Sequence, residues 1–487
     1  MRTLSAFRRL LVLGLLTEAA YIFFLVRPFP LLKYYAMPLL DLGKLTNYQP
    51  WQVVAAATGL VYLLYILAYR TDGDPRLGRL VLGLGLVFAG TQILVYPIGA
   101  LDAFDYIFFG HRMAQFGANP YLVVPMDFSS DPFYEFIGWK ELSFTYGPAW
   151  ALLSKLVGWL GRDSLLANLV LFKVVAVAAY AASSTLIYRL LLREAPQRAL
   201  RGTLFFAWNP LVVFEVASNA HNDIFVVLLL VLSVDAFAHR WRARGTSFLW
   251  LSILTKFVTA PLAPLWVAAG LRSERRWKPR LLFLLGGSIV ALALGALCYA
   301  PFLGDRSQMK VIFLAPVQRQ ELFTSSFPTL FVLKATDKLG KEQAEKLARN
   351  VAMLLLLLYA LYQTWRVKGD WQDLVRASYN VVLFYLLFLC LWFQPWYVMW
   401  VVPLAALLPS GRQARTVIVF CVSAMTKYLV FDFFWFSSPW LVDTLHVEAA
   451  AVAAIYALPL LHLAISLFGT AWRRRSTATS PILRQEQ

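Results

Sequence analysis

The chain has 487 residues, of which 60% are apolar and only 15% charged, and its 45 basic and 27 acidic residues leave a net charge of +18. Soluble domains carry about 25% charged residues, so this composition excludes an ordinary soluble protein. On so apolar a chain, the basic excess indicates loops beside anionic lipid headgroups and not a nucleic-acid partner. We therefore predict an all-α polytopic membrane protein.

Apolar segments that approach or exceed the length of a membrane span recur along the whole chain. The first follows Arg2, Arg8 and Arg9, but it contains Glu18 and lacks a small-residue cleavage site, so it is interpreted as an uncleaved span. Together the segments predict one transmembrane domain, residues 1–487, with about 12–14 transmembrane helices. The long segments are 8–26, 51–69, 77–99, 165–188, 202–217, 223–238, 281–302, 350–365, 376–393, 416–436 and 448–469, and the shorter ones are 146–160, 246–256, 259–270 and 397–409.

Clusters of arginine and lysine predict which loops face the cytoplasm, because short basic loops are retained there. Such clusters lie near residues 70–79, 189–201, 240–244, 272–280 and 473–475. This orientation places two large loops outside, at residues 100–145 and 303–349. The region 146–188 offers two apolar segments where one crossing is needed. We expect 146–160 to be a re-entrant or interfacial helix, although the opposite assignment stays open.

The outer loop 100–145 is acidic in an otherwise basic protein. Its first part, residues 102–116, has helical spacing and ends at a turn containing Gly117 and Pro120. On this helix Asp102, Asp105 and Arg112 share one face. Carboxylates near a membrane boundary are costly unless they are paired or used, which marks the two aspartates as a candidate site. The alternative is an ion-paired helix end with Arg112 as the partner.

Three further polar groups interrupt apolar segments on the predicted outer side. His221, Asn222 and Asp223 open a span, Lys256 lies between two short apolar segments, and the third group is Gln394, Trp396 and Tyr397. Each has a structural alternative: a helix cap, a snorkelling lysine and an aromatic interface belt. A lysine at this place also suits phosphate binding.

Signals for metal, nucleotide or disulfide chemistry are missing from the sequence. Cys298, Cys390 and Cys421 lie in apolar runs without a CxxC pair, and the five histidines lack metal-ligand spacing. We expect no cofactor and no metal ligands, with a divalent cation left open.

In their order along the chain, these groups resemble the GT-C superfamily of membrane glycosyltransferases, particularly its bacterial polyprenyl-phosphate-mannose-dependent mannosyltransferases. The resemblance covers roughly residues 77–440. It rests on the aspartate loop with its Asn119, Pro120, Tyr121 turn, the His221 group, Lys256 before Pro261, and the segment Gln394 to Tyr397. The aspartate loop follows the third apolar span here, whereas many relatives place it after the first.

The resemblance implies an inverting transfer of a sugar, with mannose favoured, from a polyprenyl-phosphate donor to a lipid or glycan acceptor. The implied site faces the periplasm or exterior of a bacterial inner membrane, as in cell-envelope glycan synthesis. Asp102 would be the general base, with Asp105 as neighbour or substitute, because a phosphate leaving group needs no acid catalyst. A transporter or flippase of lipid-linked sugar is the alternative function. The residues implied to bind the donor phosphate are Arg112, His221 and Lys256, and those implied to bind substrate are Asn119, Tyr121, Tyr146, Asn222, Asp223, Gln394, Trp396 and Tyr397.

Overall fold

The computed structural model describes residues 2–48, 50–314, 322–409, 411–441 and 443–478. Within these residues the regular structure is helical, and the only β-type pairings are isolated bridges between Pro30 and Val95 and between Thr324 and Trp392. The predicted all-α class is therefore confirmed.

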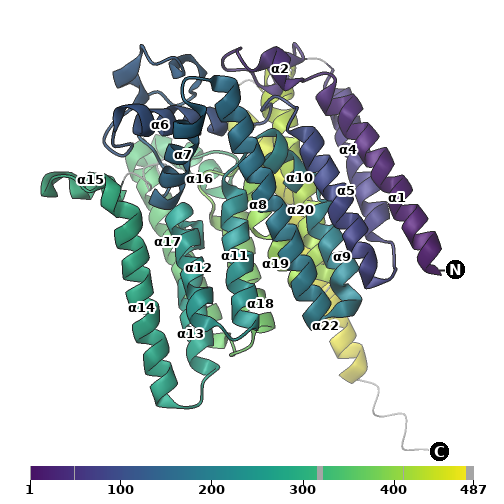
Figure 1. Cartoon of the computed structure of the whole chain (residues 1–487). Coiled ribbons are helices and arrows are strands. Elements are labelled where there is room, and N and C mark those ends of the chain that lie inside the picture. The colour runs from purple at the N-terminus through teal and green to yellow at the C-terminus, as the bar shows by residue number, and fades with distance from the viewer. Residues whose placement is uncertain (1, 49, 315–321, 410, 442, 479–487) are drawn as a thin grey trace, which may run out of the picture.

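The long helices run side by side as one bundle, with α14 at one edge and α1 and α4 at the other (Figure 1). Several pairs pack closely: α11 with α12 and α20 with α22 are antiparallel, whereas α6 and α7 run side by side in the same direction. The main helices are α1 (Arg2–Tyr21), α4 (Trp51–Tyr69), α5 (Gly78–Gln92), α6 (Asp102–Phe116), α7 (Pro148–Gly161), α8 (Leu165–Glu194), α9 (Pro196–Ala207), α11 (Asp223–Ala238), α12 (Arg242–Thr255), α13 (Ala263–Arg272), α14 (Trp277–Tyr299), α16 (Phe327–Leu339), α17 (Lys341–Arg366), α18 (Trp371–Phe384), α20 (Gly411–Leu429) and α22 (Thr444–Ala478).

Short helical turns connect these helices and shape the site. They are η1 (Ile22–Val26), α2 (Leu31–Tyr34), α3 (Leu42–Leu45), η2 (Pro75–Leu77), η3 (Pro125–Phe128), η4 (Tyr134–Phe136), α10 (Pro210–Val213), η5 (Phe214–Ser218), η6 (Phe257–Leu262), η7 (Ala300–Phe302), η8 (Arg306–Gln308), α15 (Met309–Leu314), η10 (Tyr385–Leu389), η11 (Pro395–Trp400), α19 (Val402–Leu407), η12 (Val430–Phe434) and α21 (Trp435–Ser437).

Seven helices of the described chain are long and apolar enough to cross a membrane alone. They begin at residues 4, 51, 165, 277, 341, 411 and 444. The expected 12–14 spans would also need the shorter helices, such as α5, α11, α12 and α18, which have 14 to 16 residues each. Length alone does not identify these as spans, because a straight crossing takes about 20 residues.

The surface of α14 and α17 has the character of a lipid-facing wall. Leu282 and Leu292 of α14 are 70% and 74% exposed, and Leu354 and Leu358 of α17 are more than half exposed. Contiguous exposed leucines of this kind are expected where hydrocarbon is the solvent.

The two ends of the bundle differ in charge and content. Helices α2, α6, α7 and α16 gather at one end, and the start of α1 and the last turns of α22 lie toward the other (Figure 1). The turns with the basic clusters 189–201, 240–244 and 272–280 join helices at this second end. The acidic loop therefore lies opposite the basic turns.

The structure gives the helical form of two predicted segments. The apolar segment 146–160 becomes α7, whose 14 residues extend about 21 Å, and it packs against α6. The predicted outer loop 303–349 contains helices, since α16 occupies 327–339 and α17 already begins at Lys341. Residues 315–321 of that loop lie outside the described residues.

Candidate active site

Helix α6 presents two of the aspartates of the outer loop. Asp102 and Asp105 occupy its first turn, where the helix dipole favours negative charge. Both side chains are buried, at 8% and 4% exposure. Tyr146, just before α7, donates a hydrogen bond from its hydroxyl to Asp102 Oδ2 at 2.9 Å. Asp105 lies one turn further along and borders a small cavity with Ser143 and Tyr146.

The close approach of α6 and α7 depends on two glycines. A Cβ atom on Gly158 of α7 would lie 2.3 Å from the backbone carbonyl carbon of Gly110 in α6. A Cβ atom on Gly110 would meet the Ser154 carbonyl oxygen at the same distance. No larger residue fits between these backbones, so the glycines set the position of Tyr146 relative to Asp102.

An irregular stretch of chain brings His221 to Asp102. The π-helical turn η5 ends at Ser218, and Ala220 then takes a left-handed conformation with φ of +57°. Non-glycine residues avoid this region, and strain of this kind is common at functional sites. His221 Nδ1 lies 3.7 Å from Asp102 Oδ2, and its ring stacks on the indole of Trp396 at 4.0 Å between centroids.

Lys256 provides a cation on the other side of Tyr146. It follows the last residue of α12 in extended backbone, and its Nζ donates to Asp223 Oδ1 at 2.8 Å. The same oxygen accepts a hydrogen bond from the Trp400 indole at 2.6 Å. The ammonium also lies over the rings of Tyr397, Trp400 and Tyr146, at 4.8, 5.4 and 5.7 Å from their centroids.

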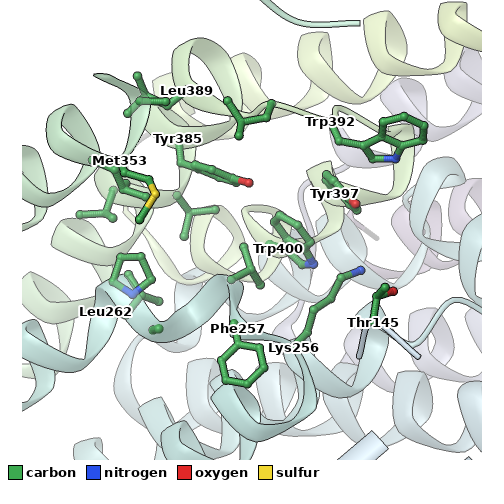
Figure 2. A pocket seen from close by; sticks show the side chains of 18 of the residues that line it. Thr145, Lys256, Phe257, Leu262, Met353, Tyr385, Leu389, Trp392, Tyr397 and Trp400 are labelled. Atoms are coloured by element: carbon green, nitrogen blue, oxygen red, sulfur yellow. The ribbon is translucent and has the colours of Figure 1, made fainter. Parts of the chain in front are cut away.

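A cavity of about 420 Å³ opens beside Lys256 (Figure 2). Its polar end is formed by Lys256, Thr145 and Tyr397, and the Thr145 hydroxyl is buried and makes no hydrogen bond within the described chain. The remaining wall is apolar and comes mainly from η6, α17, α18 and η10. Met353 of α17 lines the cavity and is 54% exposed, so this wall reaches the lipid-facing surface. The shape suits a ligand with an anionic head and a hydrocarbon tail.

Several buried polar atoms of the site lack a hydrogen bond within the described residues. They include both side-chain amide atoms of Asn222, Asp223 Oδ2 and the Trp396 indole nitrogen. Unpaired buried polar atoms are costly in a folded protein, and they are typical of sites that pair with a ligand.

Other predicted site residues lie elsewhere or support the site indirectly. Arg112 is about 15 Å along α6 from Asp102, pairs with Asp131 at 3.5 Å and stacks on two phenylalanines. Asn119 donates to the Phe302 carbonyl, and Tyr121 donates to the carbonyl of Tyr146. Gln394 accepts a hydrogen bond from Lys427 at 3.0 Å. The structure thus unites Asp102, Tyr146, His221, Asp223, Lys256, Trp396 and Tyr397, but does not bring Arg112 to them.

His111 anchors the far end of α6. Burial favours the neutral ring, but hydrogen bonds from its two nitrogens to Asp131 and Asp163 outweigh this effect and raise the pKa of His111. Asp163 follows α7, so the imidazole ties the end of one helix to the next.

Sequence reasoning missed three buried charged residues around the site. Glu215 lies 3.3 Å from His221, and Lys427 holds the carbonyl of Phe393 and the side chain of Gln394. Lys173 of α8 donates to the carbonyls of Val95, Ala217 and Ser218, which are left unpaired by the irregular chain there. Each is a charged residue within an apolar segment of the sequence. Such a residue is a candidate functional residue on that ground alone.

Within the described residues, no group of three or more His, Cys, Asp or Glu side chains has an arrangement that could hold a metal ion. The three cysteines are buried and free.

The site thus combines buried carboxylates with a lysine at the head of a cavity that reaches the lipid-facing surface of an all-α bundle. Residues 35–272 match the model of the family described as alpha-(1->6)-mannopyranosyltransferase, N-terminal domain, and this match identifies the chain as a glycosyltransferase of the GT-C type. The matched segment contains Asp102, Asp105, His221, Asp223 and Lys256, and ends before the segment 394–400. No curated protein matches the chain.

Proposed function

We propose that this mannosyltransferase uses a polyprenyl-phosphate mannose as its donor and transfers the sugar to a hydroxyl of a lipid or glycan acceptor. The observation that carries the proposal is the cavity beside Lys256, which joins one cationic head to an apolar wall that reaches the membrane surface. A nucleotide sugar has no hydrocarbon tail to fill such a wall.

The donor phosphate binds at Lys256, with the Thr145 hydroxyl as a further donor. A lysine is a compact positive charge that stabilises negative charge as the phosphate leaves. The aromatic rings of Tyr397 and Trp400 exclude water from this place and strengthen the interaction. The prenyl chain extends past Leu356 and Tyr385 to the surface of α17.

Asp102 acts as the general base. The acceptor oxygen loses its proton to the carboxylate as it attacks the anomeric carbon, and the bond to the phosphate oxygen breaks on the opposite side. Tyr146 lies between the base and the cation, since its hydroxyl contacts Asp102 and its ring contacts Lys256. This arrangement supports a single inverting displacement, with Asp105 as a neighbour that can replace Asp102 as the base.

The basic turns support a site on the extracytoplasmic face of the bacterial inner membrane. They lie at the end of the bundle opposite α6, and short basic loops are retained in the cytoplasm. Nucleotide sugars are absent from that outer compartment, so a lipid-borne donor fits the location.

The test uses purified protein in lipid nanodiscs with polyprenyl-phosphate mannose and a glycolipid acceptor. We expect Asp102→Asn to lower kcat by about 10²- to 10⁴-fold, as for loss of a general base, and NMR of the product to show an inverted anomeric centre. Asp127→Asn is the matched control, because this exposed aspartate in the same loop only caps a turn.

The comparison with Asp105→Asn assigns the base between the two carboxylates. Full activity in both variants would contradict the mechanism. A panel of polyprenyl-phosphate sugars, followed by mass spectrometry, tests whether mannose is preferred over arabinose or glucose.

A further inference from the structure

His221 lies between two carboxylates from different elements. Its Nδ1 is 3.7 Å from Asp102 Oδ2 of α6, and its Nε2 is 3.3 Å from Glu215 Oε2 of η5. The side chains of His221 and Glu215 are fully buried, and Asp102 is nearly so. One ring nitrogen therefore lies near a proposed catalytic group and the other near a structural carboxylate, and neither nitrogen makes a hydrogen bond within the described residues.

Glu215 is held by neutral donors on both oxygens. Tyr428 donates its hydroxyl to Oε1 at 2.8 Å, and Asn219 donates its amide to Oε2 at 2.7 Å. Asn219 is itself fixed, since its oxygen accepts from the Gly99 backbone at 3.1 Å. Both bonds are donated to the carboxylate, whose oxygens accept them. Stacking on Trp396 keeps the imidazole from turning away.

Of the two carboxylates, Glu215 is the nearer to His221. As an acceptor it favours the hydrogen of the neutral ring on Nε2, and the lone pair of Nδ1 then faces Asp102, which can donate to it after taking the acceptor's proton. We propose that Glu215 is a positioning residue that holds His221 in this form, so that Nδ1 receives the acceptor's proton from Asp102. The inference rests on the proposed function, and deepens it by adding a proton path behind the base.

The reaction moves one proton from the acceptor hydroxyl through Asp102 and His221 to the departing phosphate or to water. The acceptor O–H bond breaks as its oxygen bonds to the anomeric carbon, and the electron pair of the breaking carbon–oxygen bond leaves on the phosphate. The proton passes to Asp102 and then to Nδ1 of His221, giving an imidazolium between two carboxylates. The departing phosphate monoester, or water, takes this proton and restores the site.

The charged surroundings of His221 determine the expected pH effect. Asp102 comes from α6, Glu215 from η5, and Tyr428 from α20 contacts Glu215, while neighbouring Asp223 is paired with Lys256. Removing the negative charge of Glu215 disfavours a proton on either Asp102 or His221. The acidic limb of the rate profile therefore moves to lower pH when Glu215 is neutralised.

The experiment measures kcat and donor KM against pH for Glu215→Gln and Tyr428→Phe. We expect Glu215→Gln to lower kcat by about 10- to 100-fold and to move the acidic limb down by about one pH unit, with donor KM within about twofold of the wild type. Tyr428→Phe shifts both in the same direction by less. Glu18→Gln and Tyr65→Phe are the matched controls. The first neutralises a partly buried carboxylate that is bonded to Thr91, and the second removes a buried hydroxyl that is bonded to the Phe205 carbonyl.

A second readout does not depend on turnover. The ¹⁵N NMR spectrum of histidine-labelled protein, assigned with His221→Asn, should show the Nε2–H form in the wild type and a mixture in Glu215→Gln. An Nδ1–H ring in the wild type, or an unchanged kcat and pH profile in Glu215→Gln, would overturn the inference. A wild-type protein that shows the Nε2–H form but transfers nothing from polyprenyl-phosphate mannose contradicts the proposed function instead.

Discussion

Two side chains of the site have different proposed roles, Asp102 as the base and Lys256 as the cation that binds phosphate. Asp102 and Lys256 lie on opposite sides of Tyr146, one bonded to its hydroxyl and the other over its ring. The lysine is held by Asp223, so it keeps its position without a ligand. Substitutions of these residues should therefore change different kinetic constants.

We predict that Lys256→Met lowers kcat/KM for the donor by about 100-fold, because the leaving phosphate loses its stabilising charge. It should also weaken inhibition by the product polyprenyl phosphate. Steady-state kinetics with added product measures both effects. Lys140→Met, which removes a cation from the outer loop 100–145, should behave like the wild type. Unchanged product inhibition in Lys256→Met would exclude Lys256 from phosphate binding.

His111 gives the outer loop a stability that depends on pH. Its pKa is raised in the folded protein by Asp131 and Asp163, so this stabilisation is complete below the unfolded value of about 6.5 and is lost as pH rises through the folded value. Between pH 6 and pH 8.5 the apparent melting temperature should fall by about 2 °C. His111→Gln should remove this part of the pH dependence, whereas the exposed His446, replaced by Gln, should leave it intact. Identical melting profiles for His111→Gln and the wild type would contradict this role.

Pairs of helices, and not single residues, set the depth at which the aspartates lie. The parallel helices α6 and α7 meet at Gly110 and Gly158, whose backbones touch where any side chain would clash. This helix pair is therefore sensitive to one added methyl group.

Gly158→Ala should separate α6 from α7, shift Tyr146 from Asp102 and lower kcat at least tenfold. Overpacking of this kind destabilises by about 1–3 kcal/mol, and a thermal shift assay measures that loss. Gly83→Ala is the control, since its added methyl group meets no atom within 4 Å. Equal activity and stability in the two variants would show that the glycine contact does not position the site.

Helices and the acidic loop could be predicted from the sequence, because apolar runs and their polar interruptions are local signals. The bond between Lys256 and Asp223 could not, since 33 residues and a helix reversal separate the partners. Arg112 shares a helical face with Asp102, but ten residues of helix carry it to the far end, where Asp131 pairs with it. Glu215 was hidden in an apolar segment, and its role depends on a π-helical turn that no sequence pattern indicated.

The candidate active site lies near one end of the molecule, beside α6 and α7, and the basic turns lie at the other end (Figure 1). All three cysteines are buried, so a single introduced cysteine reports the side of the membrane on which it lies. The two ends can thus be distinguished without removing native residues.

We predict that Ser130→Cys, in the outer loop, reacts with a membrane-impermeant maleimide in intact spheroplasts. Arg275→Cys, in the turn between α13 and α14, should react only after lysis. Both positions are exposed, and mass spectrometry of the labelled protein gives the result. The reverse pattern would place the site in the cytoplasm and contradict the extracytoplasmic proposal.

The partly exposed Met353 in the wall of the cavity has a consequence for how the enzyme encounters its donor. A ligand that enters through a lipid-facing wall arrives by lateral diffusion, in two dimensions. Its effective concentration is then its mole fraction among the membrane lipids and not its molarity in the suspension. Dilution of the bilayer with inert lipid would slow the enzyme, whereas dilution of the vesicles with buffer would leave the rate per enzyme unchanged.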